Sequence, residues 1–434
     1  CADDLSGVSV SSAGDVNGDG LADLIVGAYA GDPAAGSGAG RSYVVFGKTG
    51  TTAINLSAIA AGTGGFVING QCTLDRSGVS VSSAGDVNGD GLADLIVGAY
   101  GGDPAAGSYA GRSYVVFGQT GTTAINLSAI AAGTGGFVIN GQGASDFSGF
   151  SVSSAGDVNG DGLADLIVGA YGGDPAAGSY AGRSYVVFGQ TSTTVIDLSA
   201  VAAGTGGFVI NGQCAGDYSG FSVSSAGDVN GDGLADLIVG ANRSDPAAGS
   251  NAGRTYVVFG QTGTTAINLS AIAAGTGGFV INGQCTLDQS GISVSNAGDV
   301  NGDGLADLIV GSNVSDPAAG SNAGRSYVVF GQTGTAAIDL SAIAAGTGGF
   351  VINGQCAGDQ SGISVSNAGD VNGDGLADLI VGSNVSDPAA GSNAGRSYVV
   401  FGQTGTAAID LSAIAAGTGG FVINGQCAGD LSGV

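Results

Sequence analysis

The sequence predicts an all-β protein built as an array of six four-stranded sheets, and three observations support this fold class. A nine-residue segment, DVNGDGLAD, recurs every 71 residues and starts at residues 15, 86, 157, 228, 299 and 370. Each repeat contains four short apolar runs separated by residues typical of turns. The 88 Gly lack the period of three found in collagen, and Gly plus Pro stays below the share typical of disordered chains.

The 71-residue period divides the chain into six units and the start of a seventh. The fifth and sixth units differ at only two positions, where Thr286 and Leu287 become Ala357 and Gly358. The expected blades cover residues 1–71, 72–142, 143–213, 214–284, 285–355 and 356–426, and residues 427–434 restart the pattern.

Each unit has four candidate strands and one short helical segment. The strand candidates are rich in Val, Ile, Tyr and Phe and lie between Gly, Asp, Asn or Pro residues. In the first unit they are residues 7–13, 22–28, 41–47 and 65–70, and residues 56–61 (LSAIAA) can form one helical turn. Four strands per repeat are typical of a β-propeller blade or a β-solenoid coil. A unit of 71 residues is too long for a hexapeptide coil and favours a β-propeller blade with one long connection.

Composition excludes several classes of function. The net charge is −26 with nine Lys and Arg, which disfavours nucleic-acid and anionic-membrane partners. No run approaches the roughly 20 apolar residues of a membrane span, so we expect no membrane insertion. The sequence has no His, which excludes a Ser-His-Asp triad and an imidazole metal site. We therefore expect no enzyme activity and no catalytic residues.

The recurring segment has the residues of a calcium-binding loop. Asp15, Asn17, Asp19 and Asp23 occupy positions 1, 3, 5 and 9, and the Leu21 carbonyl lies at position 7. Ca²⁺ takes six to eight hard oxygen ligands, and alternate residues of a tight turn can direct their oxygens at one centre. The predicted ligands are Asp15, Asn17, Asp19, Leu21, Asp23, Asp86, Asn88, Asp90, Leu92, Asp94, Asp157, Asn159, Asp161, Leu163, Asp165, Asp228, Asn230, Asp232, Leu234, Asp236, Asp299, Asn301, Asp303, Leu305, Asp307, Asp370, Asn372, Asp374, Leu376 and Asp378.

The alternative is that this loop only makes a tight turn capped by Asx side chains. Two carboxylates about 5 Å apart repel by about 3 kcal/mol at an effective dielectric constant near 20, so three in one loop favour a bound cation. An EF-hand would place Glu at position 12, but Val26 stands there, so we expect the loop to join the first two strands of a blade. We predict one Ca²⁺ per repeat, six in total, with dissociation constants of roughly 10⁻⁴–10⁻³ M, as in extracellular modules.

The recurring residues are similar to those of a known repeat family. The unit resembles the FG-GAP repeat of integrin α-chain propellers and their bacterial relatives, through residues 6–10 (SGVSV), 14–28 (GDVNGDGLADLIVGA) and 40–47 (GRSYVVFG). It differs where the family's Phe-Gly is Ser6-Gly7, and where Gly-Ala-Pro is Gly-Ala-Tyr, Gly-Ala-Asn or Gly-Ser-Asn. The resemblance implies a β-propeller, usually of seven blades. A closed ring and a part of a longer repeat filament both stay open.

Three further sets of residues recur in phase with the repeat. Cysteines occupy residues 1, 72, 214, 285, 356 and 427, and we expect free, semi-buried thiols, with bridges between units or molecules as the alternative. Six arginines open the third strands, and we expect each to pair with the Asp of a nearby Asp-Pro: Arg41, Arg112, Arg183, Arg254, Arg325 and Arg396. Two positions nine residues apart are both Tyr in units two and three and both Asn in units four to six, which predicts a contact between them. Tyr100 and Tyr109 mark a candidate recognition edge, and the alternative is an exposed loop that varies without a function.

The hypothesis that fits these features is a non-enzymatic, extracellular or cell-surface calcium-binding protein with a structural or adhesive role. It could be a filament or surface-layer component that associates head-to-tail, or bind an extracellular protein or glycan. The alternative is an integrin-like propeller that acts as a protein or glycan receptor. A hydrolase using paired carboxylates is disfavoured, because the only adjacent pair is Asp3-Asp4 and Asp4 recurs in every unit.

Overall fold

The computed structural model describes residues 4–433, so Cys1 and Asp3 lie outside the described residues. The chain separates into two compact units. Unit 1 contains Cys1–Asn211 and Gln261–Ile267, and unit 2 contains Gly212–Gly260 and Asn268–Val434. Each unit carries three similar sheets, so the predicted all-β array of six propeller blades is confirmed.

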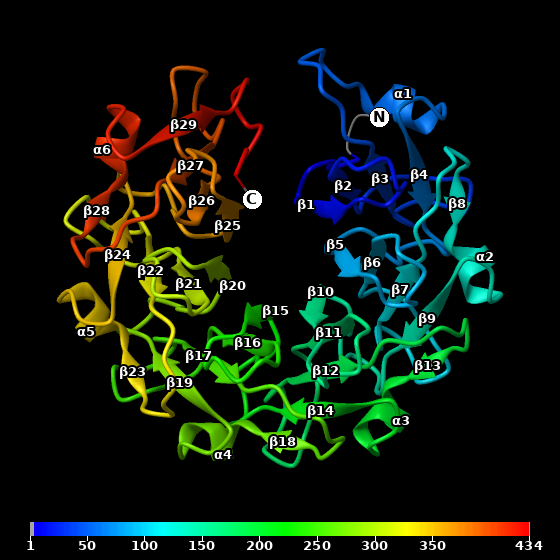
Figure 1. Cartoon of the computed structure of the whole chain (residues 1–434), viewed down its shortest axis with the longest axis horizontal. Helices are drawn as coiled ribbons and strands as arrows, with labels where there is room; N and C mark the ends of the chain where they lie inside the picture. Colours follow the sequence, from blue (N-terminus) through cyan, green and yellow to red (C-terminus); the bar gives the residue numbers. More distant parts are fainter. Residues whose placement is uncertain (1–3, 434) are drawn as a thin grey trace. The chain divides into compact units, whose positions relative to one another are not determined.

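Every blade is an antiparallel sheet in which four strands follow one another in chain order (Figure 1). The first consists of β1 (Ser9–Gly14), β2 (Asp23–Ala28), β3 (Arg41–Val45) and β4 (Gly65–Asn69). The others in unit 1 are β5 (Val81–Gly85), β6 (Asp94–Ala99), β7 (Arg112–Val116) and β9 (Gly136–Asn140), then β10 (Ser151–Gly156), β11 (Asp165–Ala170), β12 (Arg183–Val187) and β14 (Gly207–Asn211). Those of unit 2 are β15 (Ser222–Gly227), β16 (Asp236–Ala241), β17 (Arg254–Val258) and β19 (Gly278–Asn282), then β20 (Ser293–Gly298), β21 (Asp307–Ser312), β22 (Arg325–Val329) and β24 (Gly349–Asn353), then β25 (Val365–Gly369), β26 (Asp378–Ser383), β27 (Arg396–Val400) and β29 (Gly420–Asn424).

A fifth, two-residue strand joins most of these sheets, and the sequence analysis did not predict it. β8 (Ile125–Asn126) belongs to the second repeat but pairs in parallel with β4 of the first, Ile68 opposite Ile125. The Asn69 side-chain amide also donates to Asn126 Oδ1 at 3.1 Å. Each such strand ties its repeat to the preceding blade. Equivalent pairs join β13 (Ile196–Asp197) to β9, β23 (Ile338–Asp339) to β19 and β28 (Ile409–Asp410) to β24, and β18 (Ile267–Asn268) has the same place in its repeat.

A five-residue helix lies between the third and fourth strands of each repeat, where the sequence predicted a helical turn. No side chain caps the helix N-terminus, and a helix of this length is not stable in isolation. Packing holds it instead, because Leu127 and Ile130 of α2 are fully buried. The helices are α1 (Leu56–Ala60), α2 (Leu127–Ala131), α3 (Leu198–Ala202), α4 (Leu269–Ala273), α5 (Leu340–Ala344) and α6 (Leu411–Ala415). Among the described residues no helix has the length and apolar character needed to cross a bilayer.

The hydrophobic core lies between neighbouring blades, since the sheets bury apolar side chains against one another. In unit 1, Ile25 and Phe66 of the first blade pack in one cluster with Leu95 and Tyr114 of the second. Matching clusters join the second blade to the third and, in unit 2, the fourth to the fifth and the fifth to the sixth. Gly27 of β2 lies so close to the next repeat that an added Cβ would meet the Gly78 carbonyl oxygen at 2.1 Å. Blade contact therefore explains why apolar runs fill both faces of the second strands.

Candidate functional site

The predicted metal loop connects the first and second strands of each blade. In the first repeat the β1–β2 register shifts between Ser12 and Gly14, and the chain then turns through residues 15–22. Gly18 and Gly20 have φ values of 76° and 86°, a backbone conformation that favours glycine. The glycines of the DVNGDG motif therefore shape the turn.

Asp15 organises this turn from its first position. Its Oδ1 accepts the backbone N–H groups of Gly18 at 2.7 Å and Asp19 at 3.0 Å, and its Oδ2 accepts that of Gly20 at 2.8 Å. The loop is therefore closed by charge-assisted hydrogen bonds. The corresponding aspartates accept the same three bonds in the other repeats: Asp86, Asp157, Asp228, Asp299 and Asp370.

Asn17 and Asp19 lie beside each other on the loop. Asn17 Oδ1 accepts the Asp19 N–H at 2.8 Å, and the Asn17 side-chain amide donates to Asp19 Oδ2 at 3.1 Å. Asp19 Oδ1 in turn accepts the Leu21 N–H at 2.9 Å. Asp19 is exposed, so its carboxylate is accessible to an ion from solvent.

The last predicted ligand, Asp23, has a different environment. It is fully buried, and its two oxygens accept the N–H groups of Val16 at 3.0 Å and Gly47 at 2.7 Å. Because Gly47 follows β3, this carboxylate connects the loop to the third strand as well as to β2. This structural role is not evident from the sequence pattern.

Burial also changes the acidity of this position. In the second repeat, burial raises the pKa of Asp94 to about 7, although hydrogen bonds from Gly118 and Val87 oppose the rise. The carboxylates of Asp90 and Asp86 raise the pKa of Asp94 further. The loop thus concentrates negative charge around a buried carboxyl group.

The donor set of the loop suits a hard cation. It consists of carboxylate, amide and carbonyl oxygens without nitrogen or sulfur ligands, which matches Ca²⁺. The repulsion that Asp90 and Asp86 exert on Asp94 is one that a cation would relieve. Within residues 4–433, however, no three Asp or Cys side chains converge closely enough to hold an ion. Asp15, Asn17 and Asp19 fit a ligand role best, because Asp19 is exposed and Asp15 and Asn17 are only partly buried, whereas Asp23 is fully buried.

From the second repeat on, the arginine that opens the third strand donates to a Gln of the preceding repeat. Arg112 Nη2 donates to the backbone carbonyl of Asp103 at 3.4 Å, so the partner is the expected aspartate but not its carboxylate. Arg112 also donates to Gln71 Oε1, which accepts the Tyr114 hydroxyl too. Since Gln71 belongs to the first repeat, Arg112 connects two consecutive repeats.

The described cysteines are free thiols, and they are exposed, so the expectation of semi-buried thiols is wrong. Partial desolvation, followed by the neighbouring Asp75 carboxylate, raises the pKa of the Cys72 thiol. Asp75 itself accepts the Cys72 N–H, and burial raises the pKa of Asp75 to about 6. The aspartate that recurs beside each cysteine thus closes a local turn. The described thiols are at Cys72, Cys214, Cys285, Cys356 and Cys427.

An aromatic cluster lies on the loops of the second and third repeats. Tyr100 and Tyr109 both contact Phe147, with ring centroids 6.3 and 5.9 Å apart, so they meet through this third ring. Phe147 stacks on Tyr171 at 5.3 Å with an interplanar angle of 10°. Tyr109 is exposed and has φ of 55°, a strained value that Asn251 shares at the same position of the fourth repeat. The second position of the Tyr-to-Asn pair therefore has a left-handed backbone in both repeats, and in the second repeat both Tyr rings contact Phe147.

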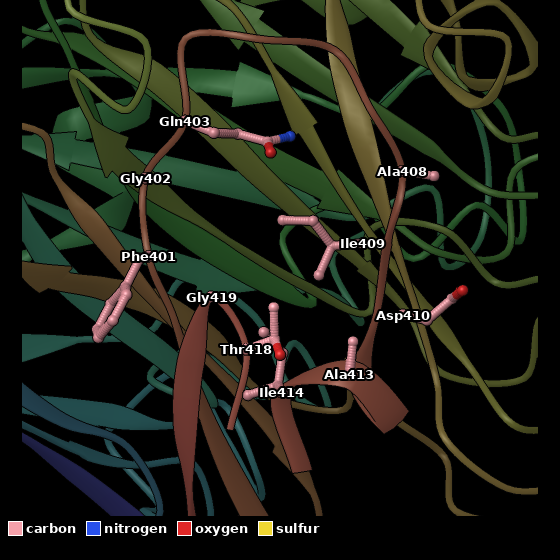
Figure 2. A pocket seen from close by; sticks show the side chains of 10 residues that line it. All are labelled: Phe401, Gly402, Gln403, Ala408, Ile409, Asp410, Ala413, Ile414, Thr418 and Gly419. Atoms are coloured by element: carbon pink, nitrogen blue, oxygen red, sulfur yellow. The ribbon is translucent and has the colours of Figure 1, made fainter. Parts of the chain in front are cut away.

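A shallow hollow recurs beside the short helix. In the sixth repeat it has a volume of about 440 Å³ and is lined by Phe401, Gln403, Ile409, Ile414 and neighbouring small residues. Figure 2 shows Ile409 pointing into this hollow and the Asp410 carboxylate pointing away from it. Asp410 instead accepts a hydrogen bond from the Asn353 side chain at 3.0 Å. The hollow lies beside β28 and α6. Among the residues that line it, Asp410 is the one carboxylate, so the lining does not supply the pair that acid–base hydrolysis needs.

Known proteins support the resemblance at the level of sequence. A curated relative, mouse integrin alpha-E, is 36% identical over 101 residues, which cover 21% of this chain and 8% of the mouse protein. The chain thus spans less than a tenth of that relative's length. A chain in the crystal structure of BBS1N in complex with ARL6DN, soaked with lead, has a TM-score of 0.43 at 10% identity, covering 91% of this chain and 79% of that one. A likeness at that score carries no functional argument.

The sequence profile described as "FG-GAP repeat" matches all six repeats. The matches fall on the first three strands and the Asp-rich loop, at residues 6–45, 77–116, 148–187, 219–258, 290–329 and 361–400. Together they cover more than half of the chain. The protein therefore belongs to the FG-GAP repeat family.

Proposed function

We propose that this protein is a non-enzymatic, calcium-stabilised structural or adhesive repeat protein of the extracellular space or cell surface. The observation that carries the proposal is the geometry of the β1–β2 loop, which recurs with the same hydrogen bonds in all six repeats. A catalytic site usually occurs once in a chain, whereas the β1–β2 loop has the same hydrogen bonds in each blade. The recurring chemistry thus favours a role in the scaffold.

In this proposal Ca²⁺ is held at Asp15, Asn17, Asp19 and the Leu21 carbonyl, and at the same positions of the other repeats. Bound Ca²⁺ supplies positive charge to a loop in which carboxylates repel one another. Asp23 keeps the loop attached to β2 and to the chain after β3. Six ions would change the formal net charge from −26 to −14 and reduce the repulsion across the whole chain.

We propose an extracellular location because calcium loops of low affinity fill only where free calcium is high. Dissociation constants of roughly 10⁻⁴–10⁻³ M are typical of extracellular calcium modules and would leave the loops empty at cytosolic calcium concentrations. The similarity to mouse integrin alpha-E, although short, points to the same environment. Near-identical blades suit a protein that presents one surface many times, as in a filament or surface layer.

Calcium titration tests this proposal. We expect equilibrium dialysis with ⁴⁵Ca²⁺ to find about six ions per chain, and thermal unfolding to shift to lower temperature in EDTA. At a free calcium concentration 100 times the dissociation constant, each site stabilises the folded chain by about 2.7 kcal/mol. The Asp161→Asn variant, which alters one loop, should bind five ions.

Magnesium at equal concentration is the matched control for ionic strength. A smaller effect of magnesium is expected, because that ion requires stricter octahedral geometry and keeps its water ligands. Unchanged melting in EDTA, together with no bound calcium at millimolar concentration, would refute a structural role for the ion.

A second candidate function is that of an integrin-like receptor propeller, and the aromatic cluster favours it. Phe147 contacts Tyr100, Tyr109 and Tyr171 in a chain whose aromatic content is only 6%. Exposed Tyr109 lies on a loop of a rigid scaffold, where ligands commonly bind. A protein or glycan with an apolar or sugar face would suit this surface.

Glycan and protein arrays test this second candidate with the Tyr109→Asn variant. Asn251 has the same backbone conformation at the matching position of the fourth repeat, so the substitution should preserve the loop. We expect binding to fall about fivefold or more if the cluster recognises a ligand, since an aromatic contact contributes about 1 kcal/mol. Equal binding by the variant and the unaltered chain would remove this candidate.

A further inference from the structure

The predicted metal loops of consecutive repeats are hydrogen-bonded to each other. The Ala93 N–H of the second repeat donates to the Asp15 carbonyl oxygen of the first at 3.1 Å. Asp15 opens its own loop, and Ala93 lies between Leu92 and Asp94, the seventh and ninth positions of the next loop. The same bond recurs inside both compact units, from Ala164 to Asp86, from Ala306 to Asp228 and from Ala377 to Asp299.

The donor of this bond belongs to the same peptide group as a predicted calcium ligand. A trans peptide bond joins the Leu92 carbonyl to the Ala93 nitrogen, and such a group is planar, so its N–H and C=O point in opposite directions. The N–H points at the Asp15 carbonyl of the preceding loop. The hydrogen bond therefore fixes the direction of the Leu92 carbonyl, the ligand predicted at the seventh position.

A second hydrogen bond extends this connection into the preceding loop. The Asp15 carbonyl shares a peptide group with the Val16 N–H, which donates to Asp23 Oδ2 at 3.0 Å. Two peptide groups thus link the buried Asp23 carboxylate to the Leu92 carbonyl oxygen. The N–H ends of both groups point toward the carboxylate and their C=O ends point away from it. Because hydrogen bonds in such a chain polarise one another, the carboxylate makes the Leu92 oxygen a stronger ligand.

The two loops also pack closely around this bond. Gly14 has φ of 72°, and a Cβ added there would lie 2.6 Å from the Ala93 Cβ. In the next pair of loops, a Cβ on Gly85 would lie 2.5 Å from the Ala164 Cβ. Glycine at this position therefore lets the Ala N–H reach the carbonyl oxygen, and a movement of one loop displaces the next.

We propose that calcium binding is positively cooperative between consecutive repeats of each compact unit and that this hydrogen bond carries the coupling. The inference rests on the proposed calcium role and specifies its regulation. A cation in the first loop holds Asp15 and its carbonyl in place, and so orders the Leu92 peptide group of the next loop. The second site then loses less conformational freedom on binding, which raises its affinity. By linkage, an ion in the second loop raises the affinity of the first by the same factor.

Charge alone predicts the opposite result. Each bound Ca²⁺ reduces the attraction of a chain with a net charge of −26 for further cations, and neighbouring ions repel each other. Loops without a structural connection would therefore bind with a Hill coefficient of one or below. A coefficient above one distinguishes the coupling proposed here from the general effect of charge.

The test isolates the loops of the second and third repeats in the full chain. Asn replaces the exposed aspartate at the fifth position of each other loop, in Asp19→Asn, Asp232→Asn, Asp303→Asn and Asp374→Asn. We expect equilibrium dialysis with ⁴⁵Ca²⁺ to find about two ions per chain and a Hill coefficient of about 1.5, which corresponds to a coupling of about tenfold between two sites. Two ions bound with a coefficient of one would overturn the inference and leave the calcium proposal intact, whereas no bound calcium would refute both.

Two substitutions at the contact between these loops test its part in the coupling. Gly85→Ala places a methyl group against the Ala164 Cβ, so it should separate the loops, bring the Hill coefficient to about one and raise the mean dissociation constant about threefold. Adding Ala164→Gly removes the clash but keeps the strain of alanine at a φ of 73°. This double variant should restore the coefficient to about 1.5, and circular dichroism checks that both variants are folded.

Restoration by Ala164→Gly would show that the contact, and not backbone strain at residue 85, carries the coupling. A Hill coefficient that stays near 1.5 in Gly85→Ala, or one that the second substitution fails to restore, would overturn the proposal.

Discussion

At the scale of single residues, the aspartates of one loop have different roles. Asp165 is fully buried, and its carboxylate accepts the N–H groups of Val158 at 3.0 Å and Gly189 at 2.9 Å. Asp161 is exposed, and its bonds from Asn159 and Leu163 lie within the loop. The sequence places both in one predicted ligand set, whereas the contacts make Asp165 a structural residue first.

We therefore expect substitutions of these two aspartates to differ in how much stability they remove and in whether the loss depends on calcium. Asp165→Ala leaves the buried Val158 N–H without a partner, so we expect a loss of about 1–3 kcal/mol in the free energy of unfolding even in EDTA. Asp161→Asn should change stability in EDTA by less than about 0.5 kcal/mol and should weaken only the calcium-dependent stabilisation. Urea unfolding of both variants with and without calcium measures this. Equal losses for the two variants in EDTA would contradict the assignment.

At the scale of elements, a two-residue strand and a five-residue helix connect consecutive repeats. Neither β8 nor α2 is stable alone, because two residues form few ladder bonds and a single helical turn does not pay for its nucleation. Both gain stability from the preceding blade, where β8 pairs with β4 and Leu127 is fully buried. The first repeat has the same sequence pattern, but its Leu56 is only half-buried.

Leu127 and Leu56 therefore form a matched pair for substitution. Leu127→Ala removes a fully buried side chain and should lower the free energy of unfolding by about 2–5 kcal/mol. Leu56→Ala, at the same place of the first repeat, should cost about 1 kcal/mol, because part of that side chain is already in water. Chemical unfolding in calcium compares them at concentrations where the chain is monomeric. Similar costs would show that the preceding blade does not stabilise this segment.

At the scale of the whole molecule, stability comes from contacts between like repeats. Four of the blade interfaces repeat the same apolar cluster, with a Tyr and a Phe as its large side chains. Stability in such an array is close to a sum over repeats and nearest-neighbour interfaces. The charge of −26 opposes this attraction, and six aspartate-rich loops carry 18 of the 35 acidic residues. Calcium at these loops, which we propose, would act where the repulsion is greatest.

The repeat period, the four strands and the helical turn were all predictable from sequence, because turn residues and β-branched runs act locally. The loop ligands Asp15, Asn17 and Asp19 were identified as candidates for the same reason, and their metal-binding role stays a prediction. The exposure of Cys72 and the carbonyl partner of Arg112 were not predictable, since both depend on the path of a loop in three dimensions and not on residue type.

Local sequence thus determined the elements of each blade, because turn and strand preferences depend on neighbours along the chain. Only the tertiary structure assigned Ile125 and Asn126 to the preceding blade and buried Asp23 between two strands. The pairing of Asn69 with Asn126 spans 57 positions, and the bond from Gly47 to Asp23 spans 24, so neither has a local signal in the sequence.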